Sequence, residues 1–305
     1  MVKLAQSAAI LLGIAVILQA CSPKQRVIKG SVALSKDLAI SYELASNPNQ
    51  DLNKVALIIP SSWDSMAVFK QQWSRPLWKE GYDILVVNQL KGGDFYRRRS
   101  QEYYGKRLGQ VLKAWRDLKN EATISGEDGL ILITAGESCY LAAELGRHLK
   151  PDHTFLINGL PFGPLAHLKN LQKKDSLNDT TQKWLRDWGI DSMEQLPATL
   201  KKVQQGNPDD FTLGNHSNKY WISYGQTNFI RDYNYLPGNV DWILFKDYPL
   251  LQTGDVKYIK KLEAVRSGEN PAIEVFPGTG LYRDETTREA LEKYFKNISR
   301  GGLLP

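Results

Sequence analysis

The stretch Leu130–Leu145, LILITAGESCYLAAEL, decides the predicted fold. It begins with an apolar run, Leu130 to Thr134, of the kind that forms a strand buried on both faces. Turn residues follow at Ala135–Cys139, and a helix-forming segment runs from Tyr140 to Leu149. We therefore expect a strand, a tight turn and a helix, with Ser138 at the apex of the turn.

This context is that of a nucleophile elbow, the G-x-S-x-G turn that exposes a reactive serine above a sheet. The matching residues are Gly136-Glu137-Ser138-Cys139-Tyr140, and the last position is tyrosine instead of glycine. Backbone N–H groups at the start of the helix would stabilise a developing oxyanion there. Ser138 is therefore a candidate nucleophile, but serine is also a common helix N-cap at such a turn. Cys139 is expected to be a buried, inert thiol, because nothing nearby supplies a base.

The rest of the chain alternates short apolar runs with amphipathic segments. The predicted strands are a hairpin of Val27–Leu34 and Leu38–Leu44, then Val55–Ile59, Asp83–Asn88, Leu130–Thr134, Thr154–Asn158, Asp241–Lys246 and Ala272–Phe276. The predicted helices are Phe69–Glu80, Tyr104–Asn120, Tyr140–Leu149, Asp179–Gly189, Ser192–Gln205, Val256–Arg266 and Asp284–Ile298. Strands that alternate with helices predict an α/β fold with a mostly parallel central sheet and helices on both faces.

Residues from about 160 to 227 interrupt this alternation with polar, Trp-containing helices and no convincing buried strand. An insertion after the carboxyl end of a strand overhangs the sheet edge where open α/β folds bind ligands. We call these residues the lid segment and interpret them as a helical lid over that edge. Packing helices without a gating role are an equally good interpretation.

With these elements in place, the chain from about Val27 to Ile298 resembles the α/β-hydrolase superfamily. The resemblance depends on the leading hairpin, the LIIPSSW sequence of Leu57–Trp63 after an early strand, the serine elbow, the insertion, and two late strands that each end in a loop. It implies a triad in the chain order Ser, Asp or Glu, His. In such a triad the histidine takes the serine proton, and the acid orients the imidazole and stabilises its charge.

The acid of this implied triad has more than one candidate. Asp247 is the nearest carboxylate in the loop that follows the first late strand. Pro249 could occupy the acid position instead, or Asp255 could reach in. Asp247 is the first choice among these alternatives.

The remaining positions depart from the pattern of the family. Leu281 stands where relatives carry the histidine, and no histidine occurs after His216. The oxyanion loop begins at Pro60 instead of the His-Gly of many relatives, so Cys139 and Ser62 are the candidate oxyanion donors. Several changes at chemical positions, within an intact scaffold pattern, indicate a site that no longer performs triad hydrolysis.

Two histidines of the lid segment, His167 and His216, are the candidate replacement bases. Either could hang over Ser138, although each can also be an ordinary surface imidazole. His148 is excluded, because ten residues of helix carry it about 15 Å from Ser138. His153 precedes a strand and belongs to the opposite edge of the sheet.

The N-terminus resembles a bacterial lipoprotein signal peptide. Lys3 supplies a positive charge, Ala8–Leu18 is an apolar stretch too short for a comfortable membrane span, and Leu18-Gln19-Ala20-Cys21 is similar to a lipobox. The resemblance implies a signal peptide at residues 1–20, a lipid on Cys21, and one α/β-hydrolase-like domain at 21–305. Ser22 after the cysteine implies sorting to the outer membrane, facing the periplasm. The alternative is an uncut N-terminal anchor.

Composition limits the remaining classes of function. The net charge is +6, and the basic residues are scattered, so we expect no nucleic-acid partner. The two cysteines cannot form a disulfide if Cys21 carries lipid. No Cys/His cluster has metal-ligand spacing, so we expect neither a structural metal nor a cofactor.

Together these features favour a lipid-anchored envelope protein with a hydrolase-like fold and an incomplete triad. It would bind a small molecule or a protein partner in the cleft under the lid. The alternative is an active serine hydrolase for an ester, thioester or peptide, with Ser138 as nucleophile and a base from the lid segment.

Overall fold

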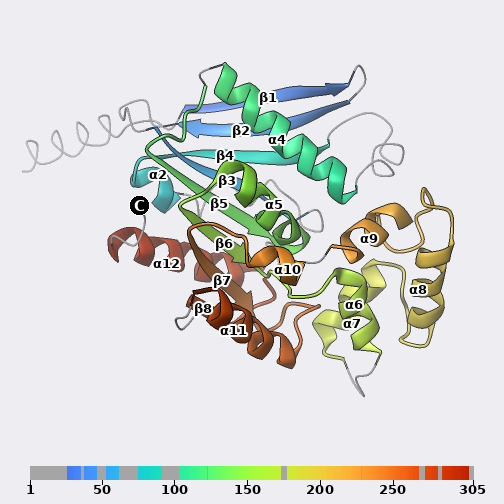
Figure 1. The fold of residues 1–305 in the computed structure, drawn as a ribbon. Coiled ribbons are helices and arrows are strands. Elements are labelled where there is room, and N and C mark those ends of the chain that lie inside the picture. The colour runs from blue at the N-terminus through green and yellow to red at the C-terminus, as the bar shows by residue number, and fades with distance from the viewer. Residues whose placement is uncertain are drawn as a thin grey trace, which may run out of the picture.

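The computed structural model describes residues 26–35, 38–46, 53–61, 75–90, 103–121, 123–172, 177–227, 229–267, 272–280 and 284–301. Eight strands in this part of the chain form one sheet, in the order β1-β2-β4-β3-β5-β6-β7-β8 (Figure 1). The strands are β1 (Arg26–Ser35), β2 (Leu38–Ser46), β3 (Lys54–Ile59), β4 (Tyr82–Leu90), β5 (Gly129–Ala135), β6 (His153–Ile157), β7 (Asn239–Phe245) and β8 (Ala272–Phe276).

Only the first two ladders of the sheet are antiparallel. β1 pairs with β2 as a hairpin, and β2 pairs with β4 antiparallel. From β4 to β8 all neighbours are parallel, for example β3 with β5 and β5 with β6. The predicted mostly parallel sheet and its leading hairpin are therefore confirmed.

Burial explains which strands the sequence predicts best. Every residue of β5 and β6 is buried, as is every residue of β3 after Lys54. Their continuous apolar runs fit strands that are covered on both faces. β1 lies at the edge of the sheet, and its residue Val27 is half exposed.

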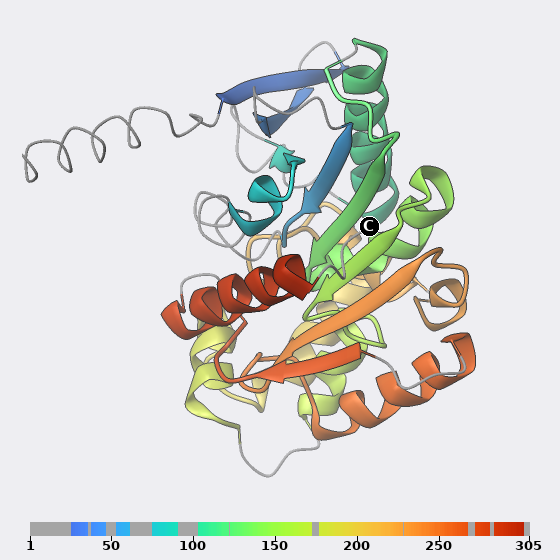
Figure 2. The same ribbon diagram turned by 90° about the vertical axis from the view of Figure 1, so that its left-hand side faces the viewer.

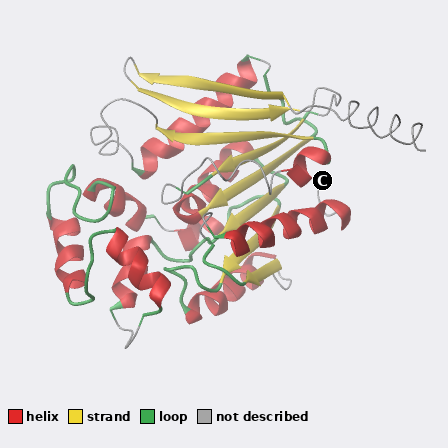
Figure 3. Cartoon of the chain, turned by 180° about the vertical axis from the view of Figure 1, so that it is seen from behind, coloured by secondary structure: helices red, strands yellow, loops and turns green. Residues whose placement is uncertain are grey.

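The helices flank the sheet on both faces (Figures 2 and 3). Helix α2 (Arg75–Lys79) packs against α12 (Glu285–Gly301) on one face, and α4 (Tyr104–Asn120) packs against α5 (Cys139–Leu149) on the other. Helix α11 (Thr253–Ser267) connects β7 to β8. The predicted helix Tyr104–Asn120 has the bounds of α4, whereas most of the predicted helix Phe69–Glu80 lies outside the described residues.

The lid segment forms four helices between β6 and β7: α6 (Pro164–Leu171), α7 (Asp179–Asp187), α8 (Gln195–Gln205) and α9 (Asn218–Gly225). They gather beside the end of the molecule at which α4 begins (Figure 1). A further short helix, α10 (Phe229–Tyr233), packs on α5 and was not predicted.

Candidate functional site

The turn between β5 and α5 is sharp, and one residue makes it possible. Gly136 has a φ of +56°, in the left-handed region that favours glycine. Ser138 has φ −65° and ψ −17°, which is a right-handed helical conformation. The prediction that Ser138 stands at the apex is therefore wrong: the left-handed residue is Gly136, and Ser138 lies two residues further on, where the helix begins.

The hydroxyl of Ser138 faces the protein interior. Its side chain is 2% exposed, and Oγ donates a hydrogen bond of 2.7 Å to the backbone carbonyl of Pro60. Ser138 occupies the N-cap position of α5, yet its side chain makes no capping hydrogen bond. The hydroxyl thus connects the turn after β5 to the end of β3, and among the described residues it forms no hydrogen bond with an imidazole.

The space beside the apex is taken by residues that the sequence did not single out. A Cβ atom built on Gly136 would lie 2.9 Å from Ser61 Oγ and 3.5 Å from the Tyr248 hydroxyl. Ser61 Oγ in turn donates a 2.6 Å hydrogen bond to Glu137 Oε2, and both residues are buried. The one signal in the sequence is Glu137 itself, a carboxylate next to a fully apolar strand.

Cys139 is engaged through both its backbone and its thiol. Its backbone N–H, a candidate oxyanion donor, points to the carbonyls of Gly136 and Glu137 within the turn. Its thiol is fully buried and contacts the carbonyl of Ile157 at 3.4 Å. Burial raises the pKa of the Cys139 thiol far above its ordinary value, so the thiol stays protonated, as expected for an inert cysteine. The other oxyanion candidate, Ser62, lies outside the described residues.

Tyr140 fills the position at which a small residue was expected. Its hydroxyl donates to the backbone carbonyl of Phe162, just before α6, and its ring contacts Tyr224 and Phe229. Burial raises the pKa of Tyr140 well above its ordinary value. The side chain therefore joins α5 to the lid segment and leaves no phenolate for chemistry.

The two candidate bases have other neighbours. His167 on α6 is fully buried, and its Nδ1 atom lies 3.6 Å from Asp255 Oδ2. The ring of His216 is stacked on Tyr220, with 3.9 Å between ring centroids. The structure thus brings His167 together with Asp255, the residue considered as an alternative acid, on the side of α11.

The two histidines that were set aside lie where the sequence indicated. His148 is half exposed near the end of α5, with Nε2 3.6 Å from Glu144. His153 is the first residue of β6, and its Nε2 is 3.0 Å from Asp241 Oδ2. Tyr294 of α12 also donates to that carboxylate, at 2.9 Å. This group braces the amino-terminal edge of the sheet.

The loops after β7 and β8 lie side by side. The backbone N–H of Asp247, the candidate acid, donates to the carbonyl of Gly278 at 3.1 Å. Asn158, which has a left-handed φ of 52°, joins both loops: its amide donates to Gly280 O at 3.0 Å and its Oδ1 accepts from Phe245 N at 3.1 Å. Leu281, at the predicted histidine position, lies outside the described residues.

Asp284 fixes the far side of the loop after β8. It accepts hydrogen bonds from the backbone and hydroxyl of Thr279, at 2.6 and 3.0 Å, and from the hydroxyl of Thr287 at 2.9 Å. Burial works to raise its pKa, but these hydrogen bonds together outweigh burial and hold the pKa of Asp284 below its ordinary value. The carboxylate is therefore a structural clamp on this loop.

Comparison with solved structures finds this topology in lipases, esterases and a thioesterase domain. An open-form lipase has a TM-score of 0.59 at 11% identity, covering 90% of this chain and 99% of the lipase. The chain has the α/β-hydrolase fold. A further neighbour is a thermostable carboxyl esterase from Bacillus coagulans, with a TM-score of 0.57 at 10% identity, covering 91% of this chain and 99% of the esterase. Another is carboxyl esterase 2 from Tuber melanosporum, with a TM-score of 0.56 at 12% identity, covering 92% of this chain and 88% of that esterase.

Neither a comparison with protein-family models nor one with curated proteins found a match. In the α/β-hydrolase fold the nucleophile sits on the strained turn between a strand and a helix. In this chain that turn is the one after β5, and its left-handed residue is Gly136.

Proposed function

We propose that this chain is a non-catalytic member of the α/β-hydrolase fold that binds a small molecule or a protein partner on the lid side of its sheet. One observation carries the proposal: the left-handed residue of the elbow is Gly136, which has no side chain to serve as nucleophile. The nearby Ser138 hydroxyl is buried and donates to Pro60. In chemical terms, we propose that the catalytic triad is incomplete in this chain.

The groups around the turn also support a non-catalytic role. Acyl transfer needs hydrogen-bond donors aimed at a developing oxyanion. Here the Ser61 hydroxyl donates to Glu137, and the Cys139 N–H points to carbonyls of its own turn. Both donors are therefore engaged within the turn and are not aimed at a developing oxyanion.

The second candidate function is an active serine hydrolase, and the presence of Ser138 beside the elbow favours it. Catalysis by Ser138 would require the loss of contacts that the structure shows. Ser138 would have to leave the Pro60 carbonyl, and His167 would have to leave Asp255 or His216 its stacked position on Tyr220.

A fluorophosphonate probe separates the two functions. We expect no labelling of the purified chain at neutral pH, in the wild type or in Ser138→Ala. Stoichiometric labelling that Ser138→Ala abolishes would overturn the non-catalytic proposal. In that case His167→Ala and His216→Ala should be compared with His148→Ala for turnover of a short p-nitrophenyl ester, because loss of turnover in one of the first two would identify the base.

We also propose that the chain is anchored to the bacterial cell envelope, at the outer membrane, through a lipid on Cys21. The motif Leu18–Cys21 supports this, although it lies outside the described residues. Within the described residues, no helix has the length and apolar character needed to cross a membrane. Cys21→Ser should abolish incorporation of an alkyne-bearing palmitate and release the chain from the membrane fraction. Unchanged labelling and fractionation would contradict the anchor.

A further inference from the structure

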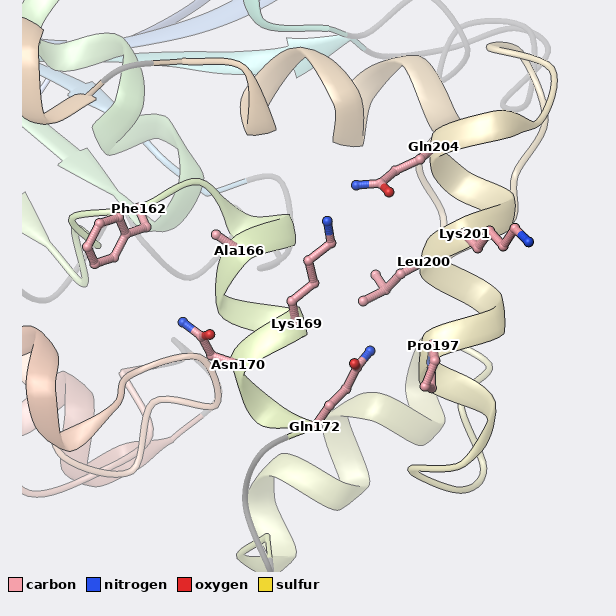
Figure 4. Close-up of a pocket in the computed structure, with 9 residues that line it drawn as sticks. All are labelled: Phe162, Ala166, Lys169, Asn170, Gln172, Pro197, Leu200, Lys201 and Gln204. Atoms are coloured by element: carbon pink, nitrogen blue, oxygen red, sulfur yellow. The ribbon is translucent and has the colours of Figure 1, made fainter.

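A pocket of about 500 Å³ lies between α6 and α8 in the lid segment (Figure 4). A volume of this size is typical of sites for small organic ligands. The pocket is remote in sequence from the elbow, and its inner wall includes Phe162, whose carbonyl accepts the Tyr140 hydroxyl. Its lining combines apolar, amide and cationic side chains: Phe162, Ala166, Lys169, Asn170, Gln172, Pro197, Leu200, Lys201 and Gln204.

The polar part of the lining carries positive charge without a balancing acid. Lys169 extends from α6 into the gap, Gln204 points toward it from α8, and Lys201 points away from the pocket (Figure 4). No Asp or Glu is among the lining residues. An ammonium group beside amides is a site for an anionic head group.

The apolar part of the lining faces the same space. Leu200 is buried and points from α8 toward α6, beside the ring of Pro197 (Figure 4). Ala166 lies on the α6 side of the pocket, whereas the ring of Phe162 lies beyond α6, 4.9 Å from the ring of Tyr258 between centroids. A ligand with a short hydrocarbon chain would remove this apolar surface from water.

We propose that the α6–α8 pocket binds an aliphatic carboxylate, with Lys169 and the amide of Gln204 at its head group and the Leu200 side of the pocket along its chain. This inference rests on the proposed binding function, for which it names the ligand class. It does not require Ser138 to react or to be inert, because the pocket does not include the elbow.

The test uses the full chain in phosphatidylcholine nanodiscs and a ten-carbon carboxylate that carries a diazirine at the chain end. Crosslinks mapped by mass spectrometry should fall in residues 162–172 and 195–205. Each methylene buried should raise the affinity about threefold to fourfold in a series of chain lengths. The matching uncharged alcohol should crosslink at least about tenfold less at the same concentration.

Matched variants assign the effect to the pocket. Lys169 and Lys202 are both exposed, but only Lys169 lines the pocket. Lys169→Gln should therefore weaken binding about threefold to fivefold, whereas Lys202→Gln should change it less than about twofold. Ala166→Trp places a bulky group in the pocket from an exposed position and should block binding without unfolding the chain. Thermal melts check that all three variants remain folded.

Several outcomes would overturn the inference. These are crosslinks outside the two segments, equal losses in Lys169→Gln and Lys202→Gln, or an alcohol that labels as strongly as the carboxylate. Absent pocket labelling together with absent fluorophosphonate labelling would reject the carboxylate site and leave the non-catalytic proposal standing. Pocket labelling together with Ser138-dependent fluorophosphonate labelling would reject the non-catalytic proposal and support the carboxylate site.

Discussion

Gly136→Ala tests the geometry on which the proposed function depends. A non-glycine residue in the left-handed region costs about 1–2 kcal/mol. The new Cβ would lie 2.9 Å from Ser61 Oγ and 3.0 Å from Ser61 Cβ, closer than atoms normally approach. Overpacking of this kind costs about 1–3 kcal/mol, and the lower entropy of the unfolded alanine chain returns about 0.4–1 kcal/mol. We therefore expect Gly136→Ala to lower the free energy of unfolding by about 1–4.5 kcal/mol.

Two other glycines separate these contributions. Gly189 has a φ of +80°, and a Cβ added to it would meet no atom within 4 Å, so Gly189→Ala reports only the cost of the conformation, about 1 kcal/mol. Gly109 is exposed within α4 and also has no atom within 4 Å, but its conformation is helical. Gly109→Ala should raise the free energy of unfolding by about 0.5–1 kcal/mol.

Urea unfolding followed by tryptophan fluorescence gives the three values, provided that the slope with denaturant stays constant. The steric part is isolated by repeating Gly136→Ala in a Ser61→Gly background, because that change removes both atoms involved in the clash. The cost of Gly136→Ala should then fall to that of Gly189→Ala. The reasoning fails if Gly136→Ala is no more destabilising than Gly189→Ala, or if Ser61→Gly brings no relief.

Three further predictions concern single side chains. Ser138→Ala should lower the free energy of unfolding by about 1–3 kcal/mol in urea, because it leaves a buried carbonyl without its donor; a neutral result would mean that the hydroxyl is free. His167→Ala should lower the same quantity by about 2 kcal/mol or more, while the half-exposed His148→Ala should change it by less than about 0.5 kcal/mol, and equal effects would contradict the buried role of His167. Asp284 has a lowered pKa in the folded state, so its stabilisation is present above the ordinary carboxyl pKa of about 4 and is lost as the pH falls through the folded-state value. Asp284→Asn should therefore be less stable than wild type at pH 7, with the difference shrinking in acid, and a difference independent of pH would refute the clamp on Thr279.

The fold was predictable because its buried strands are continuous apolar runs and its helix α4 carries apolar residues at helical spacing. The run LILIT needs cover on both faces, and β5 is buried along its whole length. The apolar residues of Tyr104–Asn120 recur at helical spacing, and α4 has those bounds. Such signals are local, so one sequence is enough to detect them.

The details of the elbow were not predictable, because contacts between distant residues decide them. Three consecutive residues, Gly136, Glu137 and Ser138, are all acceptable in a turn, and pairing of Ala135 with Ile157 determines where β5 ends. The apex then falls on Gly136, where a side chain would meet Ser61, 75 residues earlier by the numbering. No pattern within the turn reports such a contact.

The contacts of α9 decide whether this part of the lid segment is a movable gate or a packed support. Helix α9 is attached to the helices behind the elbow: the ring of Tyr224 lies 5.6 Å from that of Tyr104, and Ser223 Oγ accepts a 3.0 Å hydrogen bond from the Tyr104 backbone. Lifting α9 would also expose the buried rings of Tyr220 and Trp221. At about 1.5–3 kcal/mol for each of these three aromatic residues, opening would cost a large part of the 5–15 kcal/mol that stabilises a typical domain. We therefore infer that α9 is a fixed support of the fold and not a gate.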